Sequence, residues 1–152
     1  MGMFTKLDDR ELRAVISYLK SFSSKWKNPD FHGEKVILPP KPKALDHAEH
    51  REAFEARGRA LFMVSCAPCH GEKADGGGPQ ASALVDVHER PIKPADLLVP
   101  HLRSGSEAND ILRVLMTGLD GTPMASFADS LSAEQMWEVV VYLEALRRNT
   151  SR

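Results

Sequence analysis

The sequence contains few cysteines, little net charge and no long hydrophobic run. Among its 152 residues there are two cysteines, and 20 Lys and Arg residues against 21 Asp and Glu residues give a net charge of −1. A chain this close to neutral has no broad basic surface, which disfavours nucleic acid or an anionic membrane as its main partner. Its longest apolar stretches, such as residues 136–143, are far too short to span a membrane. The composition therefore indicates an ordinary globular domain.

Helical periodicity accounts for most of the chain, and no segment alternates as a strand would, so we predict an all-α fold. The first expected helix carries an apolar stripe at Leu12, Val15, Ile16 and Leu19. Asp8, followed by a glutamate three residues later, predicts a capping box at its start. A second helix should begin near Glu49 and run into the two cysteines.

The second half of the chain predicts two further helices and one short helix at residues 80–85. Ser106 is expected to cap a helix that Gly118 ends. Ser132, three residues before a glutamine, predicts a capping box for the last helix. Residues 28–50 are charged and rich in proline, and we interpret them as an extended linker or a surface strap.

Both cysteines belong to one motif, Cys66-Ala67-Pro68-Cys69-His70. C-x-x-C-H is the attachment signature of c-type haem. Two thiols one helical turn apart can add to the two porphyrin vinyl groups, and the histidine that follows can bind the iron. We expect a carbonyl acceptor for the other nitrogen of His70, and Pro79, after a glycine-rich turn, is the candidate.

Two other chemistries use paired cysteines. A zinc site needs further ligands, and no histidine has the paired spacing of a finger among His32, His47, His50, His88 and His101. A thioredoxin-like pair follows a strand, whereas here a helix leads into the motif. Neither chemistry explains the histidine directly after Cys69, so haem attachment is favoured.

The sixth iron ligand separates electron transfer from catalysis. Three methionines, Met63, Met116 and Met136, lie among apolar residues of the expected helices, where core packing is their default role. Met124 differs because it lies in a Gly-Thr-Pro-Met loop between two helices, from which it can reach the haem face opposite His70. We expect Met124 to be the ligand. The alternatives are that Met124 only packs in the core, or that His88 or His101 takes the position.

Together these features resemble class I c-type cytochromes, and most closely bacterial cytochrome c modules fused to or docked on periplasmic oxidoreductases. The resemblance covers about residues 51–148 and includes the haem motif, the turn to Pro79, the methionine loop and a closing helix with Trp137, Val140, Tyr142 and Leu143. It implies that Gly58 and Phe62 cross the last helix near Val139 and Tyr142.

The resemblance also implies one haem c, attached at Cys66 and Cys69, with His70 and Met124 as axial ligands and Pro79 behind His70. The haem propionates have several candidate donors: Arg90, Lys93, His101, Arg103 and Arg113. Covalent haem attachment in such proteins follows export, so we expect a periplasmic location. The first ten residues contain no apolar signal segment, so either a targeting segment has been removed or the chain is made without one.

A His/Met iron has no open position for a substrate, so the expected function is one-electron transfer between redox protein partners, without a catalytic residue. Two alternatives remain. Met124 could be labile, which would allow a peroxidase-like or gas-binding haem. The chain could also be an electron-entry subunit of a larger oxidoreductase, with its first helix as the docking face.

An internal similarity bears on domain organisation. Residues 7–19 and 131–143 align without gaps, and both carry an apolar pair followed by x-Tyr-Leu. Either two amphipathic helices look alike by chance, or the first is the closing helix of a preceding cytochrome module. On the second interpretation, residues 1–27 are that closing helix, 28–50 the linker and 51–152 the monohaem domain.

Overall fold

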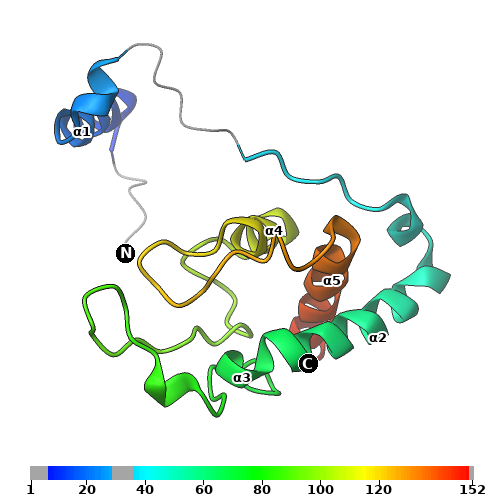
Figure 1. Cartoon of the computed structure of the whole chain (residues 1–152). Coiled ribbons are helices and arrows are strands. Elements are labelled where there is room, and N and C mark those ends of the chain that lie inside the picture. Colours follow the sequence, from blue (N-terminus) through cyan, green and yellow to red (C-terminus); the bar gives the residue numbers. More distant parts are fainter. Residues whose placement is uncertain (1–6, 29–35, 151–152) are drawn as a thin grey trace. The chain divides into compact units, whose positions relative to one another are not determined.

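Helices joined by loops make up the described part of the chain (Figure 1). The computed structural model describes residues 7–28 and 36–150, and the chain divides into two units, Met1–Ile37 and Leu38–Arg152. Within the described ranges there is no strand, and an isolated bridge pairs Val85 with Pro91. The all-α prediction is confirmed. No helix in these ranges is long and apolar enough to cross a membrane.

The first unit contains helix α1, Asp9–Ser21, and the short 3-10 helix η1, Ser24–Lys27. The predicted capping box is present: the Glu11 backbone N–H donates to Asp8 Oδ1 at 2.8 Å, and the Asp8 N–H donates to Glu11 Oε2 at 2.9 Å. The apolar stripe of α1 is exposed to solvent, with 42% of Ile16 and 55% of Leu19 accessible.

The second unit contains α2 (Ala48–Ser65), α3 (Ala67–His70), α4 (Ala108–Thr117), α5 (Ala133–Thr150) and the 3-10 helices η2 (Lys43–Asp46) and η3 (Ala81–Ala83). The expected helices are therefore found, and the helix expected at 80–85 is reduced to the single turn η3. Glu107 caps α4 in place of Ser106, because the Ser106 hydroxyl accepts a hydrogen bond from the Leu102 N–H at 2.8 Å.

Helices α2 and α5 cross in close contact, and their crossing point is Gly58. A Cβ atom at Gly58 would lie 1.9 Å from the Glu138 carbonyl oxygen, so only glycine fits. One turn further along α2, the Phe62 ring lies 5.4 Å from the Tyr142 ring. Phe62 and Val139 are both fully buried. The expected crossing of the first and last helices of the haem domain is confirmed.

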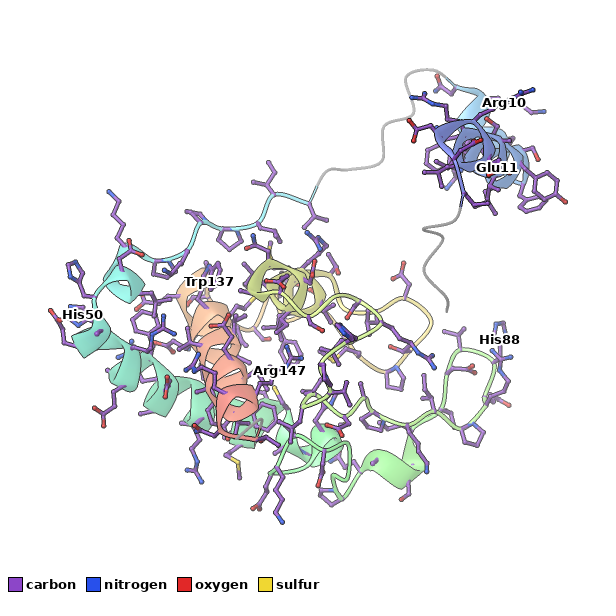
Figure 2. The ribbon with its side chains drawn as sticks, turned by 180° about the vertical axis from the view of Figure 1, so that it is seen from behind. Arg10, Glu11, His50, His88, Trp137 and Arg147 are labelled. Carbon is purple, nitrogen blue, oxygen red and sulfur yellow. The ribbon has the colours of Figure 1, made fainter. Side chains whose placement is uncertain are left out.

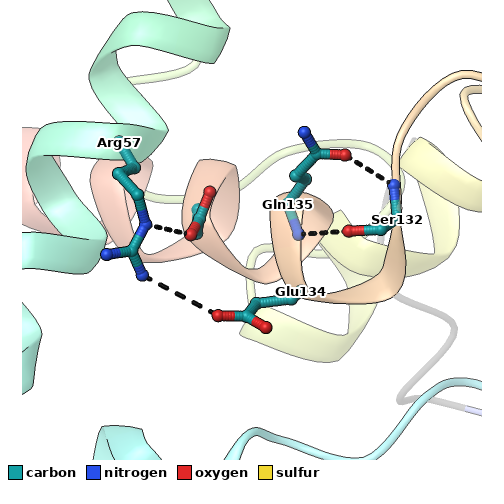
Figure 3. A network of polar contacts seen from close by, with 5 residues as sticks. Arg57, Ser132, Glu134 and Gln135 are labelled. Atoms are coloured by element: carbon teal, nitrogen blue, oxygen red, sulfur yellow. Dashed lines mark hydrogen bonds and ion pairs between the residues drawn. The ribbon is translucent and has the colours of Figure 1, made fainter.

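A polar network surrounds the start of α5 (Figure 3). The Glu138 side chain is almost fully buried, and its carboxylate is paired with Arg57 Nε from α2. A second Arg57 nitrogen lies 3.8 Å from the Glu134 carboxylate. Ser132 and Gln135 form the predicted capping box: the Ser132 N–H donates to Gln135 Oε1 at 2.8 Å, and the Gln135 N–H donates to Ser132 Oγ at 3.2 Å. The buried Glu138 carboxylate needs the Arg57 partner, because an unpaired buried charge is costly.

The second half of the expected linker packs against the core of the second unit. Leu45 in η2 is only 4% exposed and belongs to the hydrophobic core. The Trp137 indole N–H of α5 donates to the Pro39 carbonyl at 3.3 Å. The second compact unit therefore includes this part of the proline-rich segment and begins at Leu38.

Replacement of Gly58 by alanine tests the crossing. Helix propensity alone predicts a gain of about 1 kcal/mol for Gly58→Ala. The clash with the Glu138 carbonyl should outweigh this gain and give a net loss of about 2 kcal/mol or more, measured by guanidinium unfolding of the holoprotein. The control, Ala60→Gly at an exposed site on α2, should lose about 1 kcal/mol. A Gly58→Ala protein as stable as the parent would contradict the close crossing.

Candidate functional site

The cysteine motif forms one tight helical turn directly after α2. Cys66 ends α2, its N–H donating to the Phe62 carbonyl at 2.8 Å. The N–H groups of Cys69 and His70 both donate to the Cys66 carbonyl, at 3.1 and 2.8 Å. Neither cysteine forms a disulfide, and burial raises the pKa of the Cys66 thiol to about 11. This turn places two thiols and an imidazole within five consecutive residues.

The His70 imidazole is held by a backbone carbonyl, and that carbonyl belongs to Ala95. Nδ1 of His70 lies 3.1 Å from the Ala95 oxygen. Because a carbonyl can only accept, Nδ1 carries the proton and Nε2 keeps its lone pair, the arrangement a metal-binding histidine requires. Burial lowers the pKa of His70 below its usual value, and the hydrogen bond to Ala95 opposes that shift. The neutral ring is therefore favoured.

Pro79 does not supply this carbonyl, so that expectation is corrected. The glycine-rich turn that contains Pro79 folds back under the motif instead. The Gly78 N–H donates to the Cys69 carbonyl at 3.1 Å, and a Cβ atom at Gly78 would lie 2.4 Å from the Pro68 oxygen. The chain beyond this turn returns to the motif at residues 94–97, and this later segment carries the acceptor for His70.

The loop that carries Met124 is fixed by several short hydrogen bonds. The Thr122 hydroxyl donates to the Leu119 carbonyl at 2.8 Å and accepts from the Met124 N–H at 3.2 Å. The Leu119 N–H in turn donates to the Met124 carbonyl at 2.9 Å. Gly118 ends α4 with a positive φ of 68°, and a Cβ atom there would lie 2.6 Å from the Met124 oxygen. The half-buried Met124 side chain packs against the core that includes Cys66.

The structure argues against the two other cysteine chemistries. Within residues 7–28 and 36–150, no three His, Cys, Asp or Glu side chains are grouped to hold a metal ion, as a zinc site built from side chains would need. A thioredoxin-like pair lowers the pKa of its reactive thiol, whereas burial raises that of Cys66. The element that leads directly into the motif is helix α2 and not a strand.

Two of the candidate propionate donors are already engaged in ion pairs. Arg90 lies 2.8 Å from the Asp86 carboxylate, and Arg113 lies 2.9 Å from the Asp110 carboxylate. His88 and His101, the histidine rivals of Met124, are both exposed. His32 lies outside the described residues. Figure 2 shows His88 on the outer part of the loop that follows the haem motif.

The fold and the C-x-x-C-H turn define a class I c-type cytochrome domain. The chain belongs to the family described as cytochrome c oxidase, cbb3-type, subunit III, which matches residues 53–143. The cofactor of this domain is haem c, and its function is electron transfer. The free thiols of Cys66 and Cys69 and the oriented His70 ring are groups of the kind that this cofactor requires.

The chain resembles several solved structures, among them the following two. One is a chain of the reducing HAO-like protein complex of Kuenenia stuttgartiensis, with 30% identity and a TM-score of 0.76; the match covers 94% of this chain and 63% of that chain. The other is cytochrome CL of the marine methylotrophic bacterium Methylophaga aminisulfidivorans, with 18% identity, a TM-score of 0.50 and 74% of each chain covered. This second likeness shows the fold alone. No curated protein sequence matches the chain.

Proposed function

We propose that Cys66 and Cys69 attach haem c through thioether bonds and that His70 is the proximal iron ligand. The turn at the end of α2 supports this assignment, because residues three apart on a helical turn point the same way. The hydrogen bond from His70 Nδ1 to Ala95 leaves Nε2 as the ligand atom and fixes the orientation of the ring. When bound, the haem supplies a one-electron Fe(III)/Fe(II) couple.

Met124 is the proposed ligand on the opposite face of the haem. Its loop is held by Thr122 and Leu119, which supports a fixed thioether position in both oxidation states. Met136 is buried within α5, so core packing accounts for it. Met116 is partly buried like Met124, but it lies within helix α4 and not on a loop. A methionine ligand raises the reduction potential and leaves no open iron position. The chain therefore acts as an electron carrier and not as an enzyme.

Substitution of Met124 tests this assignment against a labile, peroxidase-like or gas-binding site. The oxidised parent should show the red-region sulfur-to-iron charge-transfer band. Met124→Ala should lose this band, become high-spin or bind water, and have a lower reduction potential, because alanine offers no ligand.

The matched control is Met116→Ala, which should cost about 2–3 kcal/mol of stability and keep the band. A Met124→Ala protein with an unchanged spectrum would refute Met124 as the ligand. A high-spin parent spectrum without the band would favour the labile-site alternative.

The proposed partners are redox proteins, and the proposed location is the periplasm or an equivalent outer-facing compartment. The likeness to a chain of the reducing HAO-like protein complex, at 30% identity, supports a place as a subunit that passes electrons to or from a larger oxidoreductase. A near-neutral carrier needs small and short-lived contacts, on the order of 1,200 Å² or less. Thioether formation after export supports the periplasmic location.

We also propose that α1 is the closing helix of a second cytochrome module, joined to the haem domain by the proline-rich segment. Helices α1 and α5 begin with the same capping box, Asp8 with Glu11 and Ser132 with Gln135. Their aligned apolar residues differ in one respect: those of α5 are buried and those of α1 are exposed.

The contact between α2 and α5 indicates what would cover the exposed stripe of α1. In the haem domain, Gly58 and Phe62 of α2 contact Tyr142. Tyr18 is aligned with Tyr142 and is 66% exposed. The stripe is therefore suited to a helix that presents a glycine and, four residues later, an aromatic side chain. The chain of the HAO-like complex extends well beyond its match to this chain, as a protein with an added module would.

The coding sequence that precedes Met1 tests the second module. It should encode another C-x-x-C-H motif led by a helix of this kind. The extended protein should then carry two haems per chain in an intact-mass measurement under denaturing conditions, against one haem for the 152-residue chain. An upstream sequence without that motif, or one haem per extended chain, would leave chance similarity as the explanation of the aligned helices.

A further inference from the structure

Arg147, near the end of α5, reaches from the helix to two backbone carbonyls of the loop that follows the haem motif. Its Nε donates to the Leu97 carbonyl at 2.6 Å, and its Nη1 donates to the Ser106 carbonyl at 2.9 Å. Figure 2 shows Arg147 on the side of α5 that faces the loops. Two donors on one planar guanidinium fix both carbonyls in a single geometry, which an ammonium group cannot reproduce.

The Arg147 side chain is partly buried and remains charged. Burial lowers the pKa of its guanidinium below the usual value, and nearby Glu144 opposes that shift. Arginine stays protonated in proteins, so the cation is retained at this site. A partly buried cation is costly unless it is hydrogen-bonded, and the two carbonyls meet part of this need.

The segment that Arg147 holds contains the acceptor for His70. Ala95, whose carbonyl accepts from His70 Nδ1, lies two residues before Leu97. The Leu97 N–H donates to the Ala74 carbonyl at 2.8 Å, so Leu97 is held by Ala74 through its N–H and by Arg147 through its carbonyl. A Cβ atom at Gly76 would lie 2.7 Å from the Pro94 oxygen, which shows how closely the two segments approach. Among the hydrogen bonds named here, the Ala95 carbonyl takes part in one, which it accepts from the His70 ring. Its position therefore depends on how its neighbours in the segment are held.

We propose that Arg147 is a positioning residue for the haem site: it holds the Ala95 carbonyl against His70 and thereby sets the electron-donating strength of the imidazole. This inference rests on the proposed role of His70 as the iron ligand. A firm hydrogen bond from Nδ1–H makes an imidazole a stronger donor through its other nitrogen. A stronger donor favours the oxidised iron.

The sign of the change in potential separates positioning from charge. If Arg147 acts by positioning, loosening the Ala95 carbonyl weakens the imidazole donor and raises the reduction potential. If Arg147 acts only as a nearby cation, its removal favours the oxidised iron and lowers the potential. A substitution that keeps the charge but loses the two-point contact isolates the first effect.

The experiment is a redox titration of the Arg147→Lys holoprotein. Lysine keeps the positive charge and cannot hold both carbonyls at once, so the potential should rise relative to the parent. Arg148→Lys is the matched control, because Arg148 is the next residue on α5 and its contact is an exposed ion pair with Glu55 at 3.1 Å. This control should leave the potential unchanged.

Two results would overturn the role of Arg147: an unchanged potential in Arg147→Lys, whatever its melting temperature, or a lowered potential. Should Arg147→Lys fail to assemble with haem, Arg147→Gln is titrated in its place: a potential above that of the parent supports positioning, because loss of the cation alone would lower it, and a potential at or below that of the parent overturns positioning as the dominant effect. The parent spectrum separates this failure from that of the proposed ligands. A parent without a His/Met spectrum overturns the ligand assignment itself, whereas a normal parent with an unshifted variant overturns only the positioning role.

Discussion

The close contact of α2 and α5 at Gly58 is the constraint on which the rest of the haem domain depends. A backbone carbonyl of α5 occupies the space where any other residue of α2 would carry its Cβ atom. Helix α2 then leads directly into the turn of Cys66, and α5 extends to Arg147, which is bonded to the Leu97 carbonyl. The position of the motif relative to the loop behind His70 therefore depends on the absence of a side chain at Gly58. A shift at the crossing would move the thiols and the Ala95 carbonyl relative to each other.

Local signals in the sequence were sufficient to predict most of the helices. The capping boxes at Asp8 and Ser132 and the glycine at the end of α4 depend on residues three or four apart, which a sequence pattern records directly. The acceptor for His70 could not be found in this way. Any backbone carbonyl can accept, and the one that does so lies 25 residues away along a loop whose path depends on tertiary contacts. The sequence pattern of the proline-rich segment also did not distinguish a linker from a strap, because the burial of Leu45 depends on a tertiary contact between its side chain and the core.

The residues of the candidate site also differ in how far a local sequence signal predicts them. Cys66, Cys69 and His70 are adjacent in sequence, and their chemistry can be read from the motif alone. Met124 was expected to be a ligand because of its loop, and the hydrogen bonds of Thr122 hold that loop in one conformation. Helices α1 and α5 show the limit of such patterns: nearly the same apolar stripe is exposed in one and buried in the other. A stripe predicts that a face needs a partner, and it does not say which partner.

The central claim is that Met124 and His70 hold the iron of one haem from opposite sides. It is tested most directly by a proton NMR spectrum of the reduced holoprotein labelled with carbon-13 at its methionine methyl groups. The porphyrin ring current should shift the Met124 methyl far upfield and leave the other methionine methyls near their ordinary positions. A spectrum without a strongly shifted methionine methyl, or one in which the shifted methyl belongs to another methionine such as Met116, would contradict the account.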